Sequence, residues 1–224
     1  MIPLRDSEAS HRLTLANTAL IIVNVVVFIC ELRPGRSARV LLTHWVMVPY
    51  RISHLPSGMD ALHAAATLVT SLFLHAGLLH LAGNMLYLFI FGPAVEKRVG
   101  HLRFLCFYLL AGIAAGLATV VMGPKSHTPV VGASGAIAGV LGGYFVLYPQ
   151  GRITTSILVR VVEIPAIFYL LVWFTVQLYS GIASGTHGPL VGGIAWWAHV
   201  GGFLFGVGTA PLLARPPTLH RRRS

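Results

Sequence analysis

The stretch Val130-Val-Gly-Ala-Ser-Gly-Ala-Ile-Ala-Gly-Val-Leu-Gly-Gly143 is the part of this chain that decides its fold. Thr128 and Pro129 precede it, so we predict a helix that starts near Gly132 and carries Ser134 in its first turn. Small residues then recur at helical spacing and would let neighbouring helices approach closely in a bilayer. Glycine-rich helices of this kind are most often packing surfaces, so the role of Ser134 depends on what the rest of the chain places beside it.

The composition is typical of a multi-span membrane protein and excludes an ordinary soluble domain. The 224 residues are 55% hydrophobic and only 10% charged, and the mean hydropathy is +0.77. The basic residues lie in loops and tails between apolar runs, which favours a role in membrane orientation over nucleic-acid binding. Cys30 and Cys106 fall inside apolar runs and argue against a disulfide scaffold or a cysteine-based metal site.

Hydropathy predicts six spans, each close to the ~20 residues that cross a ~30 Å hydrocarbon core. Their limits are 13–32, 76–95, 104–122, 132–148, 164–182 and 195–213. We therefore expect an all-α membrane protein: a six-transmembrane-helix bundle over residues 13–213, with a short N-tail (1–12) and a basic C-tail (214–224). An even number of spans puts both termini on one side. Eleven of the sixteen Lys and Arg lie on that side, which favours the cytoplasm. We expect a multi-pass integral membrane protein of the bacterial cell inner membrane.

Two outer loops are more than short connections. The first, residues 33–75, holds an apolar segment around Trp45 that suits the membrane interface. Its second half, 61–74, predicts a half-buried helix, and we interpret the whole loop as a structural collar. The fifth loop, 184–193, is uncharged and rich in glycine, which is typical of a mobile lid. The fifth span before it carries bulky aromatic side chains that most often face lipid.

Three predicted spans each place a polar group near their outer ends. His80 and Asn84 lie on one face of the second span, Ser134 opens the fourth, and His199 opens the sixth. Each of the residues His80, Ser134 and His199 lies about 15 residues from the inner end of its span. At 1.5 Å per residue, all three lie about 22 Å above the inner boundary of the membrane. Polar side chains at this depth are costly and by default functional, so we expect the four to form one site.

These four side chains have the chemistry of an acyl-transfer site. A serine hydroxyl needs a base to take its proton, and a neutral imidazole suits that task near pH 7. Asparagine and histidine side chains, together with backbone N–H groups at a helix start, suit an oxyanion hole. No Asp or Glu falls in this layer of the sequence, so the predicted catalytic group is a dyad and not a triad.

Four motifs together resemble the rhomboid family of intramembrane serine proteases, and the resemblance covers the chain from the first span to the last. They are Phe73-Leu-His-Ala-Gly-Leu-Leu-His80-Leu-Ala-Gly-Asn84-Met85, Glu96-Lys-Arg-Val-Gly100, Gly132-Ala-Ser134-Gly135 and Ala198-His199-Val-Gly-Gly202. Each motif is weak alone, but the four in this order on six spans are specific.

The resemblance implies a serine endopeptidase that cleaves transmembrane segments of other membrane proteins near the outer leaflet, through an acyl-enzyme intermediate. Ser134 would be the nucleophile and His199 the general base that later protonates the leaving amine. His80, Asn84 and the backbone N–H of Ser134 would stabilise the oxyanion. The implied partners are transmembrane protein substrates and the lipid bilayer. No metal, cofactor or nucleic acid is implied, and no oligomer is required.

The resemblance also implies two moving parts. The fifth loop, with Gly185 and Gly188, corresponds to a lid over the site, and the fifth span, with Trp173, corresponds to a lateral gate.

Two positions depart from the family pattern. Some members stack a tyrosine, one turn after the serine, against the catalytic histidine, whereas here that position is Ala138. The orientation of His199 is therefore left open. The Trp-Arg pair of many first loops is also absent, since Val46 follows Trp45, and the resemblance does not say what this loop does.

Two other functions stay open from the sequence. A proteolytically inactive relative would bind membrane clients, although such proteins typically lack the serine or the histidine, and both are present here. A transporter would use His75, His80 and His199 for Zn²⁺ or for proton transfer. Against this, no acid accompanies the histidines and the two halves of the chain show no repeat.

Overall fold

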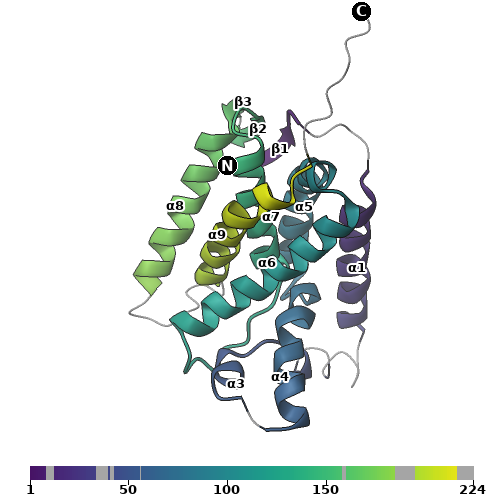
Figure 1. Cartoon of the computed structure of the whole chain (residues 1–224), viewed down its shortest axis with the longest axis vertical. Coiled ribbons are helices and arrows are strands. Elements are labelled where there is room, and N and C mark those ends of the chain that lie inside the picture. Colours follow the sequence, from purple (N-terminus) through teal and green to yellow (C-terminus); the bar gives the residue numbers. More distant parts are fainter. Residues whose placement is uncertain are drawn as a thin grey trace, which may run out of the picture.

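The computed structural model describes residues 1–8, 13–33, 40, 43–55, 57–157, 160–184 and 195–215. Its helices (Figure 1) are α1 (Leu15–Glu31), α3 (Pro49–Ser53), α4 (Met59–Thr70), the short 3-10 helix η1 (Ser71–Phe73), α5 (Leu78–Val99), α6 (His101–Met122), α7 (Ser134–Leu147), α8 (Ala166–Ser184) and α9 (Trp196–Leu213). Helices α5, α6 and α8 are long and apolar enough to cross a membrane, and Leu15–Glu31, Met59–Phe73 and Ser134–Leu147 are shorter apolar helices. The chain is a mostly helical membrane protein, and the helix predicted within 61–74 is confirmed.

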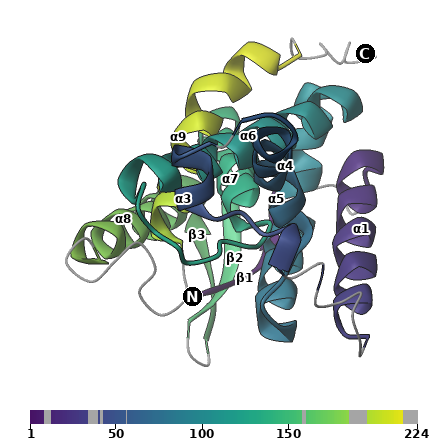
Figure 2. The same cartoon turned by 90° about the horizontal axis from the view of Figure 1, so that it is seen from below.

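Helix α7 lies at the centre of the bundle (Figure 2), in contact with α5, α6 and α9. Residues 135–144 are all buried, as expected for a helix that is apolar on every side. Helices α7 and α9 meet through glycines: a Cβ on Gly202 would collide with the carbonyl oxygen of Gly135, and one on Gly206 with that of Gly139. The close packing predicted for the small residues of α7 is confirmed, and glycines of α9 form the other side of the contact.

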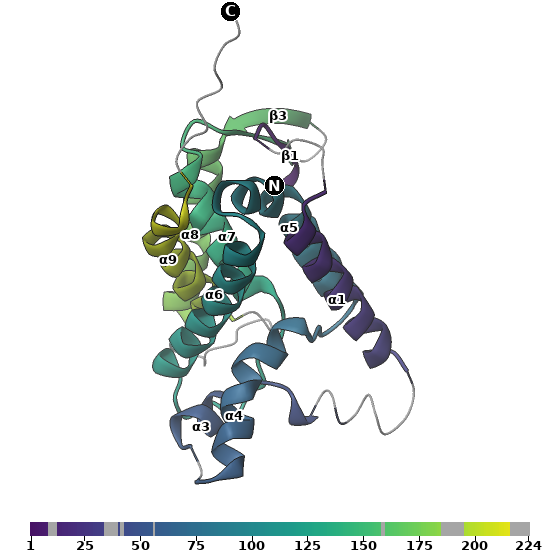
Figure 3. The ribbon, with the colours of Figure 1, turned by 45° about the vertical axis from the view of Figure 1, so that its right-hand side comes forward.

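Helix α1 is tied to α5 by a buried carboxylate. Glu96 has no exposed surface, and its two oxygens accept the backbone N–H groups of Ala16 and Asn17 at 2.9 and 2.7 Å. These N–H groups belong to the first turn of α1, where no intrahelical partner exists and negative charge is favoured. Nδ1 of His101 is also bonded to Glu96. The Glu-Lys-Arg-Val-Gly motif therefore has a structural role at this end of α5 (Figure 3).

The first loop supports the segment that leads into α7. The backbone N–H of Val130 donates to the carbonyl of Met47 at 2.8 Å, and that of Gly132 donates to the carbonyl of Ser71 at 2.9 Å. Met47 lies before α3 and Ser71 opens η1, so both ends of this described part of the loop hold the backbone two to four residues before Ser134. The predicted collar is thus also a support for the start of α7.

One end of the bundle carries an antiparallel sheet in the order β1 (Ile2–Asp6), β2 (Arg152–Ile157) and β3 (Arg160–Pro165), opposite the end with α3 and α4 (Figure 3). Ile153 and Thr155 alternate into the interior and are fully buried, and the Thr155 hydroxyl donates to the carbonyl of Ile2 at 2.9 Å. The prediction of an all-α fold is wrong here. Residues of the predicted N-tail, and of the predicted loop between the fourth and fifth spans, form strands instead. The reason is that β-branched side chains alternate there between a buried and an exposed face.

Both ends of the described chain lie at the sheet end of the bundle. Strand β1 pairs with β2 there, and the backbone N–H of Arg215, just after α9, donates to the carbonyl of Arg98 near the end of α5 at 2.9 Å. The number of membrane crossings stays a prediction. Most of the predicted lid, including Gly185 and Gly188, and the C-tail after 215 lie outside the described residues.

Candidate active site

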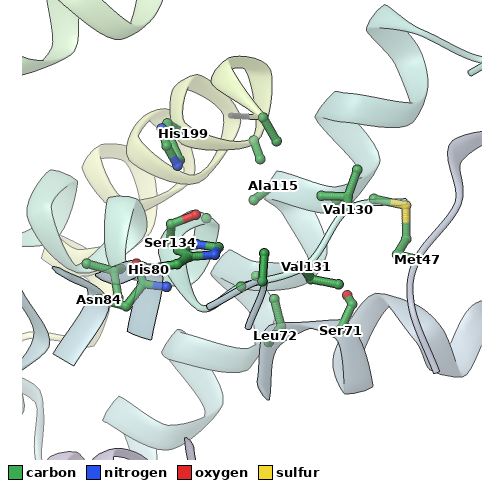
Figure 4. Close-up of a pocket in the computed structure, with 18 of the residues that line it drawn as sticks. Met47, Ser71, Leu72, His80, Asn84, Ala115, Val130, Val131, Ser134 and His199 are labelled. Carbon is green, nitrogen blue, oxygen red and sulfur yellow. The ribbon is translucent and has the colours of Figure 1, made fainter. Parts of the chain in front are cut away.

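A cavity of about 760 Å³ lies at the start of α7 (Figure 4). It is lined by all four side chains that the sequence placed at one depth: His80 and Asn84 of α5, Ser134 of α7 and His199 of α9. Helix α7 packs directly against both α5 and α9. The structure therefore brings these four side chains together at one cavity, and none of the described residues that line it is an Asp or Glu.

Ser134 is the first residue of α7, two residues after the predicted start of the helix, with Ala133 at the N-cap. Its side chain is half-buried, and Figure 4 shows the ring of His199 pointing from α9 towards it. The backbone N–H of a residue at the first helical position has no partner inside the helix. A hydroxyl, an imidazole and free backbone donors thus face the same cavity.

A pair of polar side chains borders the backbone just before Ser134. Gly132 adopts φ +116°, and a Cβ there would lie 2.6 and 2.7 Å from Cε1 and Nε2 of His80 and 3.5 Å from Nδ2 of Asn84. Asn84 is only 7% exposed, and its Nδ2 has no hydrogen-bond partner among the described residues. A buried donor without a partner is costly, so this amide is available to an oxygen atom brought into the cavity.

His199 contacts two residues that the sequence reasoning did not single out, Gln177 and Trp196, and one that it assigned to the gate, Trp173. Its Nδ1 lies 2.7 Å from Oε1 of Gln177 on α8. The ring centroid of Trp173 lies 5.9 Å from that of His199, and Trp196 approaches the ring edge to face at 6.3 Å. Gln177 is a lone amide in an apolar helix and only 7% exposed. A polar side chain inside a predicted span is unusual, and this feature of the sequence could have identified Gln177 as a candidate site residue.

His75 lies behind the cavity. The residue is only 3% exposed, and the centroid of its ring lies 5.2 Å from that of the His80 ring. Its backbone N–H donates to the carboxylate of Glu31, at the end of α1, at 3.2 and 3.3 Å. His75 therefore contacts the ring of His80 and is not among the described residues that line the cavity.

Trp173, the residue predicted for a lateral gate, lines the cavity next to His199. Its ring also lies 6.1 Å from that of Phe203 on α9, so α8 contacts α9 at this level. Its gating role stays a prediction.

Within the described ranges, no group of three or more His, Cys, Asp or Glu has the arrangement of a metal site.

The chain is similar to known proteins over most of its length. The family description "Rhomboid domain" matches residues 63–216, a stretch that begins within α4 and runs past the end of α9. The chain is 37% identical over 136 residues to the rhomboid protease GluP of Bacillus subtilis, covering 60% of this chain and 26% of that protein. It is 30% identical over 200 residues to the human presenilin-associated rhomboid-like protein, mitochondrial, covering 85% and 46%.

The chain spans less than half of the length of each of these relatives. The family match nevertheless covers most of this chain. It includes the four polar residues that line the cavity, namely His80, Asn84, Ser134 and His199. The chain belongs to the rhomboid family.

Proposed function

We propose that this protein is an intramembrane serine endopeptidase with a Ser134–His199 dyad. The observation that carries the proposal is the cavity that Ser134, His199, His80 and Asn84 line together, from three helices that are distant in sequence. Relatives at 30% and 37% identity are named as a rhomboid-like protein and a rhomboid protease, which supports the same reaction class.

The proposed reaction starts with the hydroxyl of Ser134. Its oxygen attacks the carbonyl carbon of the scissile peptide bond while Nε2 of His199 takes the hydroxyl proton. The tetrahedral intermediate collapses, the C–N bond breaks, and His199 gives the proton to the leaving amine. Water then attacks the acyl-enzyme with His199 again as base, which releases the new carboxyl end and restores Ser134.

The negative oxygen of each tetrahedral intermediate needs donors placed in advance. The backbone N–H of Ser134, the amide Nδ2 of Asn84 and the ring of His80 border the position next to Gly132 where that oxygen would lie. Gly132 leaves this space open because it has no Cβ.

The proposed substrates are transmembrane segments of other membrane proteins, cut near the outer leaflet. The lining of the cavity is mostly apolar, which suits an unwound stretch of a membrane helix. We further propose six spans with both termini in the cytoplasm of a bacterium, so that the sheet end faces inwards and the cavity lies towards the outer leaflet.

The proposal is tested by labelling the detergent-purified protein with a fluorescent fluorophosphonate and by incubating it with a reporter protein that has one transmembrane segment. The wild type is expected to take up the label and cut the reporter, and Ser134→Ala is expected to do neither while remaining folded. A folded wild type that neither labels nor cuts would leave the chain as an inactive, client-binding relative.

Gly132→Ala is expected to lower the labelling rate by about 100-fold or more, the usual cost of losing an oxyanion donor. The new methyl group would occupy the space next to His80 and Asn84. The matched control is Gly58→Ala, because Gly58 also has a positive φ (+70°) but a Cβ there meets no atom within 4 Å. Equal losses in both variants would mean that backbone strain, and not the filled space, explains the effect.

A further inference from the structure

Gln177 makes a polar contact with the proposed catalytic histidine that the dyad alone does not use. Its side chain is 7% exposed on α8, a helix whose other described side chains largely face outwards. Its Oε1 lies 2.7 Å from Nδ1 of His199, across the α8–α9 contact. A buried amide that meets a buried imidazole in an apolar bundle is costly unless the two are paired.

The contact determines which ring nitrogen carries the proton. A neutral imidazole has one N–H donor and one acceptor nitrogen. The amide oxygen of Gln177 can only accept, so the hydrogen lies on Nδ1 of His199. Nε2 is then left with a free lone pair, which is the form that can take a proton from Ser134. After that transfer, Nδ1–H of the imidazolium still donates to the same oxygen.

No other described contact can perform this task. Trp173 and Trp196 flank the ring of His199 with their aromatic surfaces, which limit its tilt but offer no in-plane acceptor to Nδ1. Ala138, at the position where a stacking tyrosine would lie, is fully buried and has only a methyl group. Trp173 is four residues before Gln177, so one face of α8 supplies both the flanking ring and the acceptor.

We propose that Gln177 is a positioning residue that holds His199, through Nδ1, in the tautomer and orientation required of a general base. This inference rests on the proposed function. It also makes a neutral amide on α8, in place of a carboxylate, the group that orients the histidine of the proposed Ser134–His199 dyad.

The test uses Gln177→Met, which keeps the length of the side chain but removes the acceptor oxygen. The maximal rate of fluorophosphonate labelling is expected to fall about 10- to 100-fold, the usual effect of losing a hydrogen bond that orients a functional histidine. The probe concentration at half-maximal rate is expected to stay unchanged. Gln177→Glu, which restores an acceptor oxygen, is expected to recover labelling to within about tenfold of wild type. Val176→Met is the matched control, because Val176 is 51% exposed on the neighbouring position of the same helix.

A second readout does not depend on activity. In protein labelled with ¹⁵N-histidine, the resonances of His199, identified by their loss in His199→Ala, are expected to report a protonated Nδ1 in wild type and a mixture of tautomers in Gln177→Met. Folded Gln177→Met with the wild-type labelling rate, or a wild-type His199 protonated on Nε2, would overturn the proposal. If Gln177→Met does not fold, equal labelling rates in Gln177→Asn and Gln177→Glu would overturn it instead. A wild type that takes up no label while its Nδ1 is protonated would count against the proposed function and not against the role of Gln177.

Discussion

His199→Ala is expected to lower the rate of Ser134 labelling by about 10²- to 10⁴-fold, the contribution of a well-placed general base. The loss should approach the upper end because none of the described lining residues is a carboxylate, and the other imidazole there, His80, lies against Gly132. The measurement is the time course of fluorophosphonate labelling in detergent, with the melting temperature recorded for each variant.

His127→Ala is the control for that experiment. His127 is exposed in the loop before α7, where its ring stacks on Tyr50, and it does not line the cavity. It is expected to label at the wild-type rate. Unchanged labelling in His199→Ala would show that another group is the base, and His80→Ala would then be the variant to measure.

Gly202→Val is expected to separate α7 from α9 and to abolish labelling. Even a Cβ at Gly202 would collide with the carbonyl oxygen of Gly135, one residue after Ser134, and lie 3.4 Å from the Cβ of Ala138. Overpacking of a well-packed core costs about 1–3 kcal/mol of unfolding free energy, and sometimes more. The shift also moves His199, one turn before Gly202, and a displacement of about 1 Å at a catalytic group can cost about 100-fold in rate.

Gly208→Val on the same helix is the matched control. Gly208 is exposed, and a Cβ there meets no atom within 4 Å, so both stability and labelling should stay near those of wild type. Thermal unfolding of the two variants, followed by fluorescence, separates the packing effect from the general cost of placing valine in α9. Equal melting temperatures in the two variants would show that the α7–α9 contact tolerates a larger separation.

The depth of the site residues could be predicted from the sequence for a physical reason. A helix rises by a constant amount per residue, and lipid excludes polar side chains, so the positions of His80, Ser134 and His199 along their spans set their height in the membrane. The small residues in the same helices predicted that those helices approach closely, and the contacts of Gly202 and Gly206 agree. The first residue of α7 differed from the prediction by two positions, because the backbone at Gly132 is held by Ser71 in a left-handed conformation.

The sheet could not be predicted in the same way. Strand β1 at the start of the chain pairs with β2, which lies between α7 and α8, and such pairing depends on where distant segments meet. Short alternating segments flanked by charged residues resemble ordinary loops between spans until a partner strand is known. The support that Met47 and Ser71 give to the backbone before Ser134 is of the same non-local kind.

The chemistry of the site and its helical setting follow from the sequence alone, since residue type, helical period and the cost of polarity in lipid are local properties. The orientation of His199 depends on tertiary structure. Gln177 could be recognised as an unusual polar residue in its span, but its partner depends on how α8 is rotated and how it packs against α9. Periodicity indicates which face of a helix is apolar. It does not encode the angle at which two such faces meet, and that angle brings the amide oxygen to Nδ1.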